Sequence, residues 1–438
     1  MKTEYRMWNL TIDGVKNIQE PITISFLDDT ISTKKDFSVK GSNVKAIYGL
    51  NGSGKTAIVT AVKILSSLLK NKDYLIERKD VLPNLINFHK KALNICTVFG
   101  RIDDGKVVRV YRYSISLAVD SSVSISKEIL EKLSDRTVNG QWKTLYSITD
   151  GTIRNDVESV SPEIVAKTTN LLRTSSLPSL LDLFKEKPAG DYASTGGLVD
   201  CRRFAQSIDV FLGNSDLHDG LLDLSMLKNP EISSERKEEV GRRLSRVIMK
   251  SLSSELVPTD LLPQYERLVS KLVSFIRIFK PELKNIEIDK RVFDDETYLC
   301  DNIFVYPNTR VNFEYESTGI KKIVSLFSYL NMMVKGGIVF IDEMDANIHD
   351  VYLDRLIAFL IEEGKGQLCF TTHSLSPIKF LKKGKHSIDF LGEDGSITSW
   401  KKNGNYAPDK LYAEGMIPGS PFNFDSFDFY SIFDVSEE

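Results

Sequence analysis

Eight consecutive residues constrain this chain more than any others: Gly49-Leu50-Asn51-Gly52-Ser53-Gly54-Lys55-Thr56. They fit the pattern Gly-x-x-x-x-Gly-Lys-[Ser/Thr] in full, after a short apolar run and before apolar residues at helical spacing over 56–69. Glycines let successive backbone N–H groups curl around a phosphate chain, and the helix that follows presents its positive end to the same anion. The stretch therefore predicts a phosphate-binding loop between a buried strand and a helix. A chance Gly/Ser turn is the alternative, and it would require neither the strand nor the helix.

Two residues of this loop have a specific chemical task. Lys55 would place its charge on the β- and γ-phosphates, and the Thr56 hydroxyl would coordinate Mg²⁺. ATP and Mg²⁺ are therefore the predicted cofactors. The predicted nucleotide-binding residues of the loop are Gly49, Asn51, Gly52, Ser53, Gly54, Lys55 and Thr56.

A second apolar strand, predicted over 338–341, ends in two carboxylates, Asp342 and Glu343. A buried strand of an α/β sheet delivers the residues at its carboxyl end to the ligand crevice. Asp342 would hold Mg²⁺, usually through water, and Glu343 would act as general base on the attacking water. A strand that simply ends in a polar turn is the alternative, and the phosphate loop elsewhere in the chain favours the catalytic interpretation.

Composition excludes several classes of protein. The 438 residues carry a net charge of −3 and are 42% apolar, which argues against global disorder and against a simple electrostatic coat for nucleic acid. The four cysteines form no C-x-x-C pair, so a thiolate zinc site is not expected. The N-terminus lacks the apolar core of a signal peptide, and no run is long enough to span a bilayer. We therefore expect a soluble cytoplasmic protein without membrane contact.

Strand and helix patterns alternate on both sides of a different middle region. We expect an N-terminal lobe over 1–120, a mostly helical insertion over 121–283, a C-terminal lobe over 284–405 and a tail over 406–438. Residues 93–117 read as a hairpin around Asp103-Asp104-Gly105. Helices within the insertion are predicted at 161–174, 177–186, 202–212, 234–256 and 262–279.

Two shorter fragments complete the pattern. Ser317 and Gly319 precede a predicted helix, where an anion could bind, and His373 follows a predicted strand, where it could hydrogen-bond a γ-phosphate. Either fragment alone is weak, because a lone histidine is more often structural. Their order and spacing relative to the phosphate loop and the paired carboxylates give them weight.

Together, GLNGSGKT, ESTGIKK, GGIVFIDEMDANIH and TTHS resemble the ABC-type ATPase head of the SMC/RecF superfamily, and in particular the compact OLD-like ATPases of bacterial phage defence. The resemblance implies an α/β P-loop NTPase fold, a mixed sheet with an antiparallel β subdomain, and a helical insertion. It also implies a head-to-head homodimer, or a higher homo-oligomer, with two ATP molecules between the heads.

The same resemblance implies roles for further residues. Ser317 and Gly319 would form the signature that reaches the γ-phosphate bound by the other protomer, and His373 would be the switch histidine. Asp345 would contact nucleotide in the loop that crosses the dimer interface, a loop that also holds Asn347 and His349. The signature reads Ser-Thr-Gly rather than Ser-Gly-Gly-Gln, so its contact across the dimer is expected to differ in shape.

The chain shows no module for a second chemistry. Only 65 residues follow His373, and no D-x-D pair of a metal nuclease is present. We therefore expect a separately encoded effector, a nuclease or a toxin. The aromatic and acidic tail at 421–434 could dock such a partner, or its rings could pack back on the head.

Two hypotheses for function stay open at this point. The first is an ATP-driven sensor or regulatory scaffold in anti-phage defence, and the second is a RecF-like repair ATPase that binds DNA. The second rests on a basic helix predicted over 235–256, although its interspersed glutamates fit an ordinary solvated face. Lys321 and Lys322, next to the signature, are a smaller candidate for contacting nucleic acid or the trans site.

Overall fold

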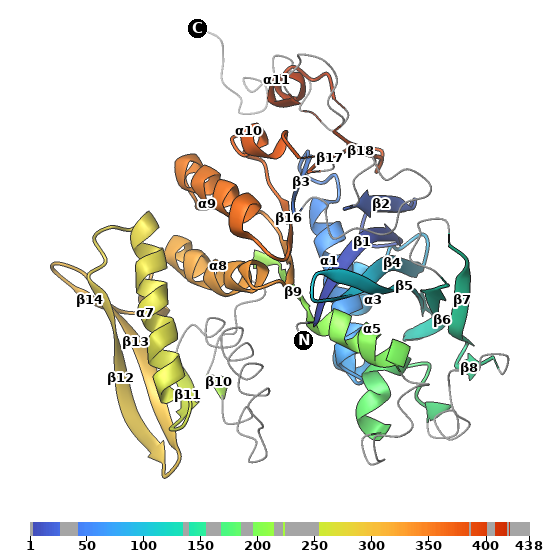
Figure 1. Ribbon diagram of the computed structural model, residues 1–438, viewed down its shortest axis with the longest axis horizontal. Coiled ribbons are helices and arrows are strands. Elements are labelled where there is room, and N and C mark those ends of the chain that lie inside the picture. Colours follow the sequence, from blue (N-terminus) through green and yellow to red (C-terminus); the bar gives the residue numbers. More distant parts are fainter. Residues whose placement is uncertain are drawn as a thin grey trace, which may run out of the picture.

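The computed structural model describes residues 3–26, 43–134, 140–154, 168–184, 196–213, 222–223, 254–384, 387–400, 408–417 and 420. These residues form three sheets with helices packed around them, a mixed α/β architecture (Figure 1).

The first sheet is antiparallel and has the strand order β2-β1-β4-β5-β6-β7-β8. Alternating residues of its long strands are buried, as expected of a sheet with one face on a core. The predicted hairpin at 93–117 is confirmed, and Asp104 and Gly105 both take positive φ values, 46° and 80°, as a two-residue turn requires. The strands are β1 (Thr3–Asp13), β2 (Ile22–Ser25), β4 (Ala92–Asp103), β5 (Lys106–Val119), β6 (Val123–Leu133), β7 (Trp142–Thr149) and β8 (Thr152–Ile153).

The segment expected to open a helical insertion at residue 121 instead continues this first sheet as β6, β7 and β8. The core-facing positions of β6 include Glu128, whose buried carboxylate accepts hydrogen bonds from the hydroxyls of Tyr113 and Tyr146. A polar residue at a core position weakens the alternation that marks a strand, so the pattern of β6 is hard to recognise from the sequence.

The second sheet has the order β18-β17-β3-β16-β15-β9, and all its strands are parallel except β18. Its central strands are buried on both faces, which is typical of a parallel sheet covered by helices. The predicted strands at 338–341 and 367–371 are confirmed. The strands are β3 (Val44–Gly49), β9 (Ile208–Phe211), β15 (Ile338–Ile341), β16 (Gln367–Thr371), β17 (Ile388–Leu391) and β18 (Ile397–Ser399).

Helices cover this second sheet on both faces. Ile47 and Phe340 pack into the core that contains α1 (Lys55–Lys70), whereas Tyr48 and Val339 pack into the core of α8 (Thr318–Val334) and α9 (Asp350–Glu363). Neighbouring residues of one strand thus belong to two different cores, because successive side chains point to opposite faces.

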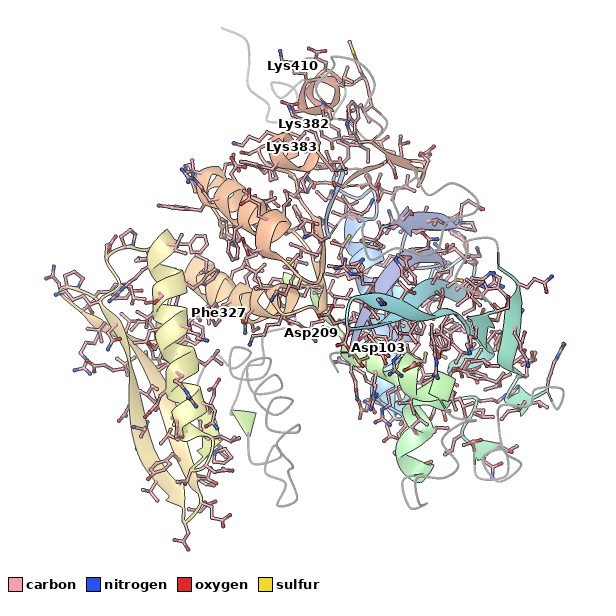
Figure 2. All side chains as sticks on the ribbon, in the orientation of Figure 1. Asp103, Asp209, Phe327, Lys382, Lys383 and Lys410 are labelled. Carbon is pink, nitrogen blue, oxygen red and sulfur yellow. The ribbon has the colours of Figure 1, made fainter. Side chains whose placement is uncertain are left out.

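The third sheet has its own core, which α7 (Leu262–Phe279) covers, as predicted for 262–279. It lies beside α8 at one end of the molecule, where Phe275 of α7 meets Phe327 of α8 at 5.2 Å between ring centroids (Figure 2). Its strands are β10 (Leu222–Asp223), β11 (Ser254–Pro258), β12 (Asn285–Asp294), β13 (Thr297–Val305) and β14 (Arg310–Asn312).

The remaining predicted helices differ from the structure in type or bounds, or lie partly outside the described residues. Residues 177–184 form a 3₁₀ helix, η1, and the helix predicted at 202–212 is α5 (Gly196–Gln206), which gives way to β9 at Ile208. Residues 161–167 and 234–253 of two further predictions lie outside the described residues, as does the tail from 421. Short helices complete the fold: α2 (Tyr74–Glu77), α3 (Leu82–Leu85), η4 (Phe313–Tyr315), α10 (Ile378–Leu381) and α11 (Pro408–Ala413).

One glutamine joins the first two sheets. The buried amide of Gln367, at the start of β16, accepts from the Met7 N–H and donates to the Met7 carbonyl, both at 2.8 Å. Met7 lies where the register between β1 and β4 shifts. The Gln367 side chain therefore makes the two hydrogen bonds that a neighbouring strand would make at this irregularity. These bonds hold β1 against β16.

Across the stretches that the structure describes, no helix is both long and apolar enough to cross a membrane.

Candidate nucleotide-binding site

The sheet order brings three loops to one edge. Strands β3, β16 and β15 are neighbours and run parallel, so their carboxyl ends meet at the same edge of the second sheet. The phosphate loop follows β3, the paired carboxylates follow β15, and His373 follows β16. The structure therefore brings together the three fragments that the sequence predicts as one site.

Close approach and backbone conformation explain the glycines of the phosphate loop. A Cβ on Gly49 would lie 2.7 Å from the Ser53 hydroxyl oxygen, and Gly52 and Gly54 take φ values of 82° and 112°. Residues other than glycine rarely adopt such φ values. This backbone conformation turns consecutive N–H groups toward one point. The loop leads directly into α1, whose first residues are Lys55 and the half-buried Thr56.

Lys55 lies folded over this loop. Its ammonium donates to the carbonyl oxygens of Gly49 and Leu50 at 2.6 and 2.8 Å, and the side chain is buried. Burial lowers the pKa of Lys55, while the negative charges of Asp342, Glu343 and other nearby carboxylates act in the opposite direction. Within the part of the chain that the structure describes, the buried Ser53 hydroxyl has no hydrogen-bond partner. The loop thus holds one cation and one orphaned polar atom where phosphate oxygens could engage both.

The two carboxylates differ in their surroundings. Asp342 is buried, and its Oδ1 accepts from the Thr371 hydroxyl at 2.6 Å. The same hydroxyl oxygen accepts from the Glu343 N–H at 2.7 Å. The Glu343 side chain is exposed, and its backbone takes the left-handed φ of 48°. One threonine of β16 therefore fixes the metal-ligand candidate and the backbone of the base candidate together.

A lysine of α8 contacts the backbone of Glu343 from the other side. The buried ammonium of Lys322, on α8, donates to the Glu343 carbonyl at 2.6 Å. Its neighbour Lys321 instead donates to the Glu314 carbonyl. The hypothesis that both lysines face nucleic acid or a trans site is therefore wrong for Lys322, because this side chain is buried against the loop after β15. Two adjacent lysines at a helix start do not indicate from the sequence which of them donates to a backbone carbonyl of a distant loop.

Asp345 organises the end of β16. Its Oδ2 accepts from the backbone N–H groups of His373 and Ser374 at 3.2 and 3.1 Å, and its buried Oδ1 has no hydrogen-bond partner among the residues described. Partial desolvation and the charge of Lys55 lower the pKa of His373, and the carboxylates oppose this effect. Because Lys55 and the acidic residues all act on its pKa, His373 belongs to the same electrostatic site.

The residues present fit a magnesium ion. Thr56 follows β3 and Asp342 follows β15, and both carry hard oxygen donors; among the described residues Asp342 Oδ2 has no hydrogen-bond partner. No group of three or more His, Cys, Asp or Glu residues that could hold a metal occurs within the described ranges. Mg²⁺ usually takes one or two protein oxygen ligands and completes its shell with phosphate and water, and these two side chains are ligands of that kind.

Ser317 and Gly319 lie at the start of α8. Ser317 is exposed and caps this helix, since its hydroxyl accepts from the Ile320 N–H at 3.3 Å. A Cβ on Gly319 would lie 3.6 Å from the Cβ of Asn347, in the loop after the carboxylates. His349 caps α9 through its Nδ1. The start of α8 therefore lies beside the loop after β15. The hydrogen bond of the Ser317 hydroxyl is made to its own helix and not to the phosphate loop.

Sequence reasoning missed two contacts to the phosphate loop. The Asn17 amide donates to the Gly52 carbonyl at 2.6 Å, and Ile18 lies 3.1 Å from the position of a Cβ on Gly54. Each comes from a segment more than 30 residues away, so no local motif could have indicated it.

Comparison with solved structures finds heads of SMC proteins. The Smc head of Pyrococcus furiosus, with an extended coiled coil and bound to the C-terminal domain of ScpA, aligns at 13% identity over 91% of this chain and 96% of that one, with a TM-score of 0.41. The SMC head domain of Thermotoga maritima aligns at 15% identity over 91% and 100%, with a TM-score of 0.33. No family model and no curated protein matches the chain. Because these TM-scores are below 0.5, the assignment of the site rests on its geometry.

Proposed function

We propose that the protein is an Mg²⁺-dependent ABC-type ATPase that hydrolyses ATP to ADP and phosphate. The observation that carries this proposal is the sheet order: the loop with Lys55 follows β3, the pair Asp342 and Glu343 follows β15, and His373 follows β16, so all of them come from the carboxyl ends of three adjacent parallel strands. Phosphoryl transfer needs a cationic cradle, hard oxygen ligands for a metal and a base near the attacking water. All three lie at one sheet edge.

Each residue has a task in this reaction. The phosphate loop binds the triphosphate through backbone N–H groups, and Lys55 moves from the Gly49 and Leu50 carbonyls onto the phosphates. Glu343 accepts a proton from the attacking water, and its backbone is fixed by Thr371 and Lys322. Thr56 and Asp342 would hold Mg²⁺, which when bound would neutralise part of the phosphate charge.

We further propose that two copies close head to head over ATP. Ser317 and Gly319 are on the surface of α8 and border the loop with Asp345 and Asn347 rather than the phosphate loop of the same chain. A second copy could therefore present its Ser317 to the bound γ-phosphate. A role as regulatory scaffold for a separately encoded nuclease or toxin in anti-phage defence is the finer part of this proposal, and it rests on the resemblance of the motifs.

Glu343→Gln is the decisive variant. It keeps the size and the backbone contacts of the residue but removes the base, so ATP binding should persist while hydrolysis falls by at least about 10²-fold. Calorimetry and phosphate release would measure the two quantities, and Lys55→Ala should lose both. The base assignment fails if Glu343→Gln turns over ATP at the wild-type rate.

Dimerisation is tested by light scattering on the same variant. ATP should convert Glu343→Gln from monomer to dimer, and Ser317→Arg should block this conversion while leaving ATP binding by the single head intact. A Glu343→Gln protein that stays monomeric with saturating ATP would contradict the head-to-head arrangement.

A further inference from the structure

The turn over residues 14–18 lies between β1 and β2 and contacts the phosphate loop. It begins at Gly14, whose φ of 72° favours glycine. The Lys16 N–H donates to the Leu85 carbonyl at 2.8 Å, and the side-chain amide of the buried Asn87 donates to the Lys16 carbonyl at 2.7 Å. Both backbone groups of Lys16 are therefore fixed by a neighbouring segment, so the backbone of the turn is held independently of the phosphate loop.

Asn17, the next residue of this turn, contacts two glycines of the phosphate loop. Its side-chain amide donates to the Gly52 carbonyl at 2.6 Å, and a Cβ on Gly54 would lie 3.2 Å from its Oδ1. A Cβ on Gly52, by contrast, would meet no atom of the described residues within 4 Å. Packing therefore leaves the permissive backbone of Gly52 free to change conformation, and hydrogen bonds are what restrict it.

The hydrogen bond from Asn17 sets the direction of one N–H of the loop. The Gly52 carbonyl and the Ser53 N–H belong to one planar trans peptide and point in opposite directions. With the carbonyl held toward Asn17, the Ser53 N–H donates to the Leu50 carbonyl at 3.2 Å, and the same carbonyl accepts from Lys55 at 2.8 Å. A rotated peptide would instead turn a carbonyl oxygen toward the position of the anion.

We propose that Asn17 is a positioning residue of the phosphate loop, whose amide holds the peptide between Gly52 and Ser53 with its N–H toward the phosphates and its carbonyl away from them. This inference rests on the proposed function. When Lys55 moves onto the phosphates it releases the Leu50 carbonyl, and the contact from Asn17 still orients the peptide. Asn17 therefore contributes to ATP affinity by preparing the loop, and it takes no part in the chemical step.

Asn17→Ala and Asn17→Leu test the inference together, because both remove the donor and the second keeps a branched side chain of similar size. The side chain is exposed, so both variants should fold. We expect the Kd for ATP, measured by calorimetry on the full chain, to rise roughly two- to tenfold in both, the equivalent of one neutral hydrogen bond. The KM for ATP should rise in the same proportion, and kcat should fall by less than about twofold. This split between affinity and turnover separates positioning from general loss of structure.

Asn84→Ala is the matched control. Asn84 is also an exposed asparagine whose amide donates to a backbone carbonyl, that of Asp80 at 3.2 Å, and this contact lies outside the phosphate loop. Its loss should leave the Kd for ATP at the wild-type value. The inference is overturned if wild type binds ATP and both Asn17 variants bind it equally well, or if Asn84→Ala weakens binding to the same extent. If wild type and Asn84→Ala bind no ATP at all, the proposed function itself fails, and the inference fails with it.

Discussion

Lys322 offers a direct test of whether α8 positions the proposed base Glu343. We expect Lys322→Met to slow ATP hydrolysis while nucleotide binding is retained. Methionine matches the length of lysine and is a good helix former, so α8 should persist. What disappears is the hydrogen bond from the ammonium to the Glu343 carbonyl and a positive charge close to Asp342, Glu343 and Asp345.

The size of the effect follows from the contact. A hydrogen bond that involves a charged group contributes about 1.5–3 kcal/mol, and the Glu343 carbonyl would keep only the Ala346 N–H, at 3.1 Å, as a donor among the described residues. If the whole of this energy stabilises the transition state of hydrolysis and none of it the bound ATP, its loss should lower kcat about 10- to 150-fold. The KM for ATP should change by less than about threefold, because Lys322 does not contact the phosphate loop.

Steady-state phosphate release over a range of ATP concentrations measures both quantities. Lys321→Met is the matched control, since Lys321 is the adjacent lysine and donates to the Glu314 carbonyl instead. It should hydrolyse ATP at nearly the wild-type rate. Chemical denaturation should show that both variants are folded. A Lys322→Met protein with at least half the wild-type kcat would refute the proposed clamp, as would an equal loss in both variants.

Two predictions concern the scaffold. Burial raises the pKa of Glu128 to about 7, although hydrogen bonds from Tyr146, Leu177 and Tyr113 lower it in part. The pKa of Glu128 is thus higher in the folded protein than in the unfolded chain, so the free energy of unfolding should fall as pH rises from about 4.5 to 7, by about 3 kcal/mol at most. Glu128→Gln should abolish this part of the pH dependence. Urea titrations at pH 5 and pH 8 would measure it. Gln367→Leu should cost about 2–5 kcal/mol, because it leaves both backbone groups of the buried Met7 unpaired, and a loss below 1 kcal/mol in urea unfolding would speak against the bridge.

The sequence predicts those parts of the site that local chemistry determines. Glycines at fixed spacing before Lys55 need a turn between strand and helix, and an apolar run ending in Asp342 and Glu343 needs a buried strand. Because the carboxyl ends of adjacent parallel strands lie at one edge of the sheet, the two fragments together predict a single site. The position of the strand that ends before His373, between the other two, required the sheet order.

Other parts depend on contacts between distant segments. β9 reads as the end of a helix, and it is a strand because its four residues pair with β15. β6 and β7 belong to the first sheet although Glu128 interrupts their apolar pattern. Lys322 and Asn17 contact the site through backbone groups more than 20 residues away. Backbone recognition leaves no residue-type signature, and the sequence could not indicate these contacts.

The bridge between Gln367 and Met7 bears on how motion could spread through the molecule. Four residues beyond Gln367, β16 ends at Thr371, which contacts both Asp342 and Glu343. A rotation of the antiparallel sheet would therefore pull on the same short strand that aligns the two carboxylates. An inhibitor or a binding protein that grips the outer sheet could for this reason change the rate of the reaction while sitting far from the nucleotide.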